Sequence, residues 1–282
     1  MNYYQQLNKV IEFIGKNIDE ELSLEKLSEI ACISQFHFHR LFTAFTGLSL
    51  QQYIKWLRLK RAARQLIFDK DQSIINIAIN AGFESHEAFS RAFKKACGLS
   101  PNQYRYAADF GLWEKPPYCL PERGATEMKV EIKNSHKIRL AVIEHRGDPK
   151  LLPDSINKLM TWAKTKIPHF KLKAGEAFAF AYNDPKTTPA DEFCFDLGIK
   201  VSENLKLDGD VVEKFIPAGR YAVAVHKGSR DKIGETVYPL YREWLPNSGE
   251  QLGDLPCIFC YYNFEHEVAE TESLTEIWLL LK

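Results

Sequence analysis

The chain has 282 residues, of which 45% are hydrophobic and 12% aromatic, and its 37 basic and 37 acidic residues leave no formal net charge. This composition excludes an intrinsically disordered chain and allows two domains with cores of their own. No apolar run approaches the roughly 18 residues that a membrane-spanning helix needs. The polar first residues give no secretory signal and the six cysteines are scattered, so we expect a cytoplasmic protein.

The charge is unevenly shared along the chain. Residues 1–108 carry 14 basic against 10 acidic residues, whereas the remainder carries 23 against 27. A basic front half favours a polyanionic partner, and an acidic back half does not. The charge pattern therefore indicates nucleic acid as a partner of the front half only.

The front half, residues 1–110, predicts an all-α domain. Apolar residues at helical spacing predict a first helix near residues 7–18, and Ser23 is placed to cap a second over residues 24–31. After a break, Ser34 is placed to cap a third helix that runs to about Phe45. A positioning helix, a tight turn and a helix with polar early residues form a helix-turn-helix. Its outward-facing candidates are Gln35, Phe36, His39, Arg40 and Thr43.

A second unit of the same kind follows. Residues 50–68 predict a longer, basic helix that can hold two modules at a fixed separation, and Ser73 is placed to cap a helix over residues 74–81. Ser85 is placed to cap the next helix, and Gly98 ends it. The apolar stripe of that helix leaves an opposite face with His86, Glu87, Ser90, Arg91 and Lys94. Two such units predict contacts with successive major grooves, about 34 Å apart.

The two units are copies of each other. FHRLFTAFTGLSLQQY, from Phe38, lines up with FSRAFKKACGLSPNQY, from Phe89, at a constant offset of 51 residues. One matching residue means little, but a whole run in one register indicates an internal duplication. The sequence therefore predicts two recognition helices in one chain.

The segments GFESHEAFSRAFKKACGLSPNQYR, from Gly82, and SQFHFHRLF, from Ser34, resemble the DNA-binding domain of the AraC/XylS family of bacterial transcription regulators. The resemblance implies double-stranded promoter DNA as partner and a nucleoid-associated location. It implies that the first groove is contacted by Gln35, Phe36, His39 and Arg40, and the second by His86, Glu87, Ser90 and Arg91. Either arginine suits bidentate pairing with guanine, and Glu87 can accept from cytosine.

Plainer interpretations compete with these. A lone arginine on an amphipathic helix is usually a solvated charge, and only the duplicated context favours DNA contact. Three histidines of the front half lack clustered cysteine or acidic ligands, so we expect no metal. Glu87 meets phosphate repulsion unless a cytosine or an arginine pairs with it.

The chain changes character after the front half. WEKPPYCLPERG, from Trp113, is rich in proline, which predicts a linker over residues 111–127. Beyond it RLAVIEHRG, from Arg139, echoes RYAVAVHKG, from Arg220, and FDLGI, from Phe195, echoes TEIWL, from Thr275. Each half reads strand, strand, helix, strand, strand. Residues 128–282 therefore predict an α+β domain of two pseudo-twofold halves, so the whole chain is multidomain.

The segments IKNSHKIRLAVIEHRGD, FIPAGRYAVAVHKGS, YREWLPNSG and PCIFCYYN resemble the GyrI-like (BmrR-type) effector-binding domains, and the domain order is Rob-like. The resemblance implies a small-molecule effector. Phe259 stands where cation-binding or hydrolytic members have a glutamate, so a buried cation lacks its counter-charge there. We therefore expect an apolar or amphipathic ligand, although Glu265 and Glu267 lie close by in sequence. Candidate ligand residues are Phe180, Tyr182, Tyr221, Phe259, Tyr261 and Trp278.

Three interpretations of the back half stay open. It senses a small ligand, it hydrolyses small hydrophobic electrophiles, or it is a ligand-free module that binds a protein. Phe259 argues against hydrolysis because it leaves water without a general base, so we expect no enzyme, no catalytic residue and no cofactor. Aromatic residues on strands more often form a core than a ligand site. RNA polymerase is a further candidate partner.

Overall fold

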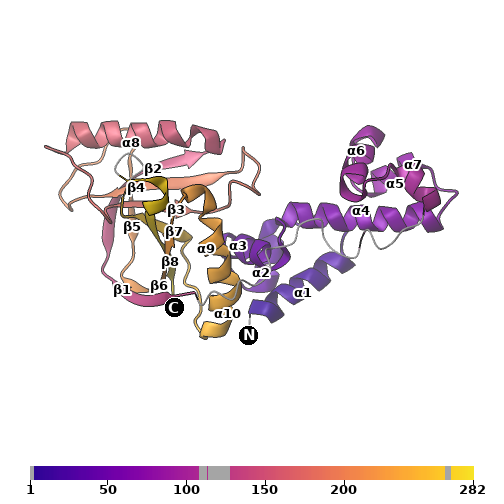
Figure 1. The fold of residues 1–282 in the computed structure, drawn as a ribbon, viewed down its shortest axis with the longest axis horizontal. Helices are drawn as coiled ribbons and strands as arrows, with labels where there is room; N and C mark the ends of the chain where they lie inside the picture. The colour runs from indigo at the N-terminus through magenta and orange to yellow at the C-terminus, as the bar shows by residue number, and fades with distance from the viewer. Residues whose placement is uncertain (1–2, 108–112, 114–127, 264–267) are drawn as a thin grey trace. The chain divides into compact units, whose positions relative to one another are not determined.

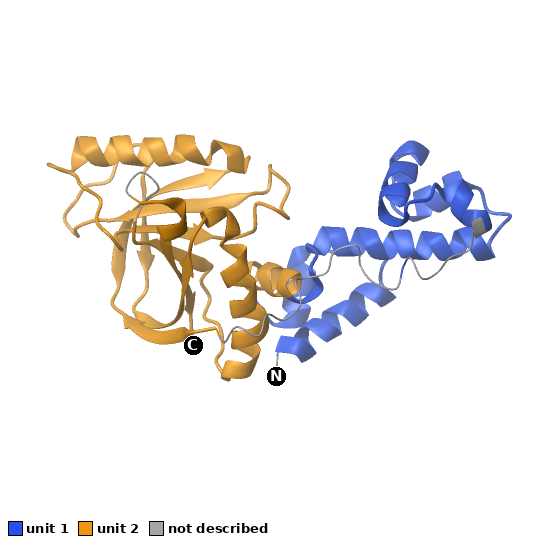
Figure 2. Ribbon diagram, viewed as in Figure 1, with its two compact units in different colours: residues 1–33, 45–124 blue, residues 34–44, 125–282 orange. Residues whose placement is uncertain are grey.

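The computed structural model describes residues 3–107, 113, 128–263 and 268–282 (Figure 1). Its contacts group the chain into two units, residues 1–33 with 45–124 and residues 34–44 with 125–282 (Figure 2). Apart from Trp113, the expected linker 111–127 lies outside the described residues, as do Glu265 and Glu267. None of the described helices combines the length and the apolar character that crossing a membrane requires.

The first unit is helical, as expected. Its helices are α1 (Tyr3–Lys16), α2 (Leu24–Ala31), α4 (Leu50–Phe68), α5 (Ile74–Asn80), α6 (His86–Cys97) and α7 (Pro101–Ala107). The predicted serine caps are confirmed for α2, α5 and α6, where Ser23, Ser73 and Ser85 accept from the third backbone N–H of each helix. Ser49 and Ser100 begin α4 and α7 with reciprocal bonds to a glutamine three residues on.

The core of this unit joins α4 to the helices that follow it. Phe89 and Phe93, one turn apart on α6, are fully buried with Tyr104 of α7 and with Trp113. The ring centroids of Phe93 and Tyr104 lie 5.3 Å apart, and those of Phe93 and Trp113 lie 5.4 Å apart. Burying one face of α6 in this cluster fixes which of its side chains reach solvent.

Helix α4 also ties the ends of two other helices together. Arg58 donates to the carbonyl oxygen of Ile18, beyond the end of α1. Arg61 pairs with Asp19 at 2.5 Å and donates to the carbonyl oxygen of Asn80, the last residue of α5. Cationic groups at helix ends satisfy carbonyl oxygens that have no partner within the helix. The expected role of residues 50–68 as a strut therefore has a physical basis in these two arginines.

The second unit is built on one antiparallel sheet. Its strands are β1 (Val130–Ser135), β2 (Ile138–Arg146), β3 (Ala177–Ala181), β4 (Cys194–Lys200), β5 (Val212–Ile216), β6 (Gly219–Lys227), β7 (Cys257–Tyr261) and β8 (Leu274–Leu280). Its helices are α3 (Gln35–Thr46, of which 35–44 fall in this unit), α8 (Leu152–Lys166), α9 (Gly234–Pro239) and α10 (Leu245–Ser248), with a π-helical turn (Leu240–Trp244) between the last two.

The strand order is β1-β6-β8-β7-β3-β4-β2-β5. The first half contributes β1 to β4 and the second half β5 to β8, and equivalent strands of the two halves lie at equal distances from the two edges of the sheet. The predicted pseudo-twofold is thereby confirmed, with its axis between β7 and β3. The repeats also exchange a strand: β1 pairs with β6 of the other half, and β5 pairs with β2. Exchanging edge strands ties the two halves into one sheet.

The two faces of the sheet differ. His145 of β2 contacts Ser155 of α8, and His226 of β6 contacts Thr236 of α9, so both helices cover the face to which these histidines point. The opposite face holds an apolar cluster that includes Phe178, Phe180, Tyr221, Ile258 and Trp278. Since neighbouring residues on a strand point to opposite faces, these two environments alternate along every strand.

Candidate functional sites

Helix α6 presents the side chains expected to contact the second groove. His86, Glu87 and Arg91 are exposed and Ser90 is half-buried, while Phe89 and Phe93 anchor the other face. The pKa of Glu87 lies below its ordinary value because the carboxylate accepts from its own backbone N–H and from the Ser85 hydroxyl. Gly98 ends the helix with φ at 81°, a conformation that a glycine adopts without strain. This helix can therefore present a polar, partly cationic surface to a duplex.

Helix α3 presents its candidates differently. Gln35 is exposed, Phe36 and His39 are half-buried, and Arg40 is buried at 5% exposure. The expectation that Arg40 and Thr43 point outward was wrong, because both are buried within the structure. Arg40 Nη2 donates to the carbonyl oxygens of Ala181 at 3.1 Å and of Asn183 at 3.4 Å.

Other groups of α3 are buried as well. His37 Nε2 lies 3.0 Å from the carbonyl oxygen of Gly253, and Nδ1 lies 3.1 Å from the Tyr241 hydroxyl. Burial lowers the pKa of His37 to about 4, and it lowers the pKa of His39 to about 4. Both rings are therefore neutral at physiological pH, and the only full cation on this part of α3 is Arg40.

The six candidate ligand residues do not form one cluster. Phe180, Tyr182, Tyr221 and Trp278 lie on the face that holds the apolar cluster, where the Tyr221 and Trp278 rings are 5.4 Å apart. Phe259 pairs with Ala179 and Ile277, which point to the helix-covered face, and Tyr261 shares that side. The strand register therefore divides the six candidate ligand residues between the two faces of the sheet.

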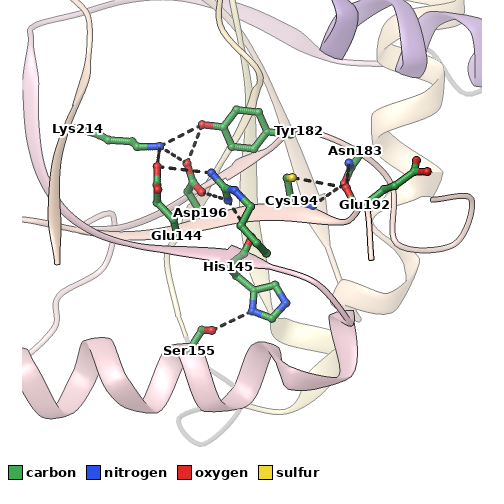
Figure 3. A network of polar contacts seen from close by, with 10 residues as sticks. Glu144, His145, Ser155, Tyr182, Asn183, Glu192, Cys194, Asp196 and Lys214 are labelled. Atoms are coloured by element: carbon green, nitrogen blue, oxygen red, sulfur yellow. Dashed lines mark hydrogen bonds and ion pairs between the residues drawn. The ribbon is translucent and has the colours of Figure 1, made fainter. Parts of the chain in front are cut away.

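A polar cluster that is absent from the sequence-based predictions lies on the same face as Tyr182 (Figure 3). Asp196 of β4 is fully buried, and it accepts from Arg146 at 2.6 Å, Lys214 at 2.6 Å and the Tyr182 hydroxyl at 2.7 Å. Glu144 adds a second carboxylate that pairs with Lys214 and Arg146. Four strands or strand ends, β2, β3, β4 and β5, are joined by this cluster.

The other half of the sheet has a smaller counterpart. Glu276 of β8, 80 residues after Asp196, is nearly buried and accepts from Lys133 at 2.9 Å and from the Trp278 indole at 2.8 Å. Lys133 lies opposite Tyr221, as Lys214 lies opposite Leu140 in the first half. The signal was present in the sequence, since FDLGI and TEIWL align a carboxylate with a carboxylate.

Histidines and cysteines of the sheet have structural surroundings. His145 and His226 each contact a hydroxyl of the covering helix and the carbonyl oxygen of a loop residue, so the two histidines have matching surroundings in the two repeats. Burial raises the pKa of Cys257 to about 11 and that of Cys260 to about 12. Among the described residues no group of three histidine, cysteine or acidic side chains could hold a metal ion.

Comparison with known proteins covers both units. Residues 128–282 match the model of the GyrI-like small molecule binding domain, and residues 27–107 match that of a helix-turn-helix domain. The probable transcriptional regulator YgiV of Escherichia coli K12 is 34% identical over 155 residues, which are 55% of this chain and 96% of that protein. The multiple antibiotic resistance protein MarA of the same organism is 34% identical over 99 residues, 35% of this chain and 77% of that protein.

One of the solved structures to which this chain is similar is the DNA-binding domain of AdpA, a global transcriptional factor, in complex with a target DNA. It is 30% identical, with a TM-score of 0.33, over 36% of this chain and 91% of that chain. The family models and the two regulators together account for most of the chain. The chain belongs to the GyrI-like family, and it joins that small-molecule binding domain to an AraC-type helix-turn-helix domain as a DNA-binding transcriptional regulator.

Proposed function

We propose that this regulator recognises a specific promoter sequence through α6 and α3, and that its GyrI-like domain responds to an apolar or amphipathic small molecule. The observation that carries the DNA contact is the exposed face of α6, where His86, Glu87, Ser90 and Arg91 stand on a buried phenylalanine pair. Arg91 is the residue best suited to a guanine, because a guanidinium donates to O6 and N7 together. Gln35, Phe36, His39 and Arg40 of α3 are proposed for the other groove.

The experiment that tests this proposal is selection of bound duplexes from a random DNA pool by the full chain, followed by affinity measurements on the selected site. Replacing Arg91 by alanine should cost about 1–3 kcal/mol and relax the preference at one base position. Replacing Lys94, which is also exposed on α6, should weaken all sequences alike and lower the salt dependence. Equal losses on every sequence for Arg91→Ala would show a backbone contact instead.

For the effector, we propose the helix-covered face of the central strands. Helix α8 packs over β2 and β4 and α9 over β6, so β3 and β7 run between the two helices. On that face β3 carries only the alanines 177, 179 and 181, while β7 carries Phe259 and Tyr261. Small side chains beside aromatic ones favour a flat apolar ligand, and Phe259 supplies no charge for a cation.

Two other functions of the GyrI-like domain, hydrolysis and ligand-free protein binding, have less support than a small-molecule sensor. A hydrolase would need an acid or base at this face, where Phe259 stands in place of a glutamate. A ligand-free protein-binding module is favoured by the opposite face, where Phe180 and Tyr221 are 2% and 0% exposed and fill the interior. We place the regulator in the cytoplasm with its DNA, and RNA polymerase is its candidate protein partner.

A further inference from the structure

The second unit of the structure includes α3, the first proposed recognition helix, and three of its side chains, Phe36, His37 and Arg40, hold it there. Arg40 donates to the carbonyl oxygens of Ala181 and Asn183, at the end of β3. The Phe36 ring meets the Tyr182 ring edge-on, with centroids 6.1 Å apart. These contacts all fall on one short segment, residues 181–183, which leads out of the sheet.

His37 contacts a second part of the same surface. Its two ring nitrogens meet the hydroxyl of Tyr241, in the π-helical turn after α9, and the carbonyl oxygen of Gly253, in the loop before β7. Tyr241 is fully buried. The surface that receives α3 therefore consists of residues 181–183, Tyr241 and Gly253, and we call it the α3 site.

The same side chains cannot serve DNA and the α3 site together. A base-reading arginine needs both ends of its guanidinium for O6 and N7 of a guanine. In the structure, Nη2 of Arg40 is already engaged by two carbonyl oxygens, and the residue is 5% exposed. Phe36 and His37 flank it on the same part of the helix. Occupation of the α3 site thus removes this helix from a duplex.

We infer that the α3 site of the GyrI-like domain and the DNA major groove compete for helix α3, so that the domain restrains DNA binding directly. The inference rests on the proposed function, since it requires that α3 contacts DNA. It adds a physical link between the two activities of the chain, because Tyr182 belongs both to the α3 site and to the Asp196 cluster.

The contacts are suited to reversible release. Among the described residues, the hydrogen bonds of Arg40 go to carbonyl oxygens and not to a carboxylate, and its Nε has no hydrogen-bond partner there. A buried guanidinium with an unsatisfied donor is held less firmly than a fully paired one. Asp184, the acidic residue next to this segment, attracts Arg40 and His39 without a direct hydrogen bond to either in the described structure. The α3 site therefore binds the helix well enough to hide it, and a duplex offers Arg40 the phosphates and base edges that the site lacks.

The test uses the full chain and the duplex selected from the random pool. Tyr241→Phe removes the hydroxyl that meets His37 and keeps the ring, so it weakens the α3 site without emptying the core. We expect the affinity for the selected duplex to rise between about twofold and tenfold, the usual range for one neutral hydrogen bond. Tyr262→Phe is the matched control, since it removes a hydroxyl elsewhere in the same unit and should leave the affinity unchanged.

A second measurement follows His37 itself by NMR titration of its ring. In the free chain the ring should titrate near pH 4, and adding the duplex should move it towards the ordinary value of about 6.5. A free chain in which His37 titrates at that ordinary value would overturn the inference, and so would equal affinities for wild type and Tyr241→Phe. A chain that selects no DNA sequence would instead refute the proposed function, and with it the competition.

Discussion

Asp196 and Lys214 form an ion pair at 2.6 Å in which the carboxylate is fully buried and the ammonium lies near the surface. The second oxygen of Asp196 is paired with Arg146, also at 2.6 Å, so each oxygen has a cation of its own. A buried carboxylate without such partners would cost several kcal/mol, and the pairing offsets that cost. The cluster thus fixes the positions of β2, β4 and β5 on one half of the sheet.

Replacing Asp196 by asparagine should destabilise the protein by about 1–3 kcal/mol, because Arg146 and Lys214 lose a buried charged acceptor and keep only Glu144 as a carboxylate partner. Urea denaturation of the full chain measures this cost. Glu213→Gln is the control, since Glu213 pairs with Arg139 at 2.6 Å but is largely exposed, and it should cost about 1 kcal/mol or less. Similar costs for the two variants would show that burial of Asp196 does not strengthen its role.

The same cluster predicts a loss of stability at alkaline pH. Burial alone would lower the pKa of Lys214, but its hydrogen bonds to Asp196 and Glu144 raise that pKa above its ordinary value. Burial and the hydrogen bond to Asp196 together raise the pKa of Tyr182 to about 12. Above about pH 10 the unfolded chain releases these protons while the folded chain keeps them, so stability is fully present below that pH and falls as pH rises.

Denaturation midpoints between pH 8 and pH 11 measure this effect. The double variant Tyr182→Phe with Lys214→Met removes both protons, so its stability should fall less steeply over that range than the wild-type stability. Equal slopes would assign the alkaline loss to other groups.

The elements of this protein followed from local sequence, and their partners did not. Capping serines and apolar spacing act over a few residues, and they predicted the helices. The internal repeat predicted the two halves of the sheet, because matching segments such as those that begin at Arg139 and Arg220 fold alike. The exchange of β1 and β5 between the halves had no such signal. A strand can pair with any sheet edge that offers free backbone groups, and its own sequence does not determine which edge that is.

The candidate sites show the same division. Arg40 and Arg91 occupy equivalent positions of the duplication, so sequence alone predicted equal exposure, yet only Arg91 is exposed. The difference comes from the contacts of Arg40 with Ala181 and Asn183, which lie far away in the sequence. Phe259 and Trp278 were both predicted to be ligand residues because both are aromatic and lie on strands. The register of β7 and β8 places them on opposite faces of the sheet, and the sequence alone does not give that register.

Gly82 lies in the loop between α5 and α6, where the backbone requires a glycine. Its φ is +78°, and a Cβ there would lie 2.8 Å from Nη1 of Arg58. Gly82→Ala should therefore destabilise the protein by about 1–2 kcal/mol, from the left-handed conformation alone. Gly15→Ala is the matched control in α1, where a Cβ meets nothing within 4 Å, and it should stabilise by about 0.5–1 kcal/mol. Thermal unfolding of both variants checks the opposite signs, and a neutral Gly82→Ala would mean that Arg58 and the loop move aside freely.

The proposed effector face predicts a preference for neutral ligands. Tetraphenylphosphonium and triphenylphosphine oxide are an aromatic cation and a neutral aromatic of related shape, and calorimetry gives the affinity of each for the full chain. The neutral compound should bind at least about tenfold more tightly, because Phe259 leaves the cation without a counter-charge in an apolar site.

Paired variants locate the ligand on the sheet. Phe259→Leu should weaken binding of the neutral compound several-fold, since it removes an aromatic surface on the helix-covered face. Phe178→Leu makes the same change on the opposite face, where the ring packs against Trp278 at 6.1 Å, and it should lower stability while leaving the affinity unchanged. The reverse result would place the ligand in the apolar cluster of that face, and tighter binding of the cation would require an acidic group that Phe259 does not provide.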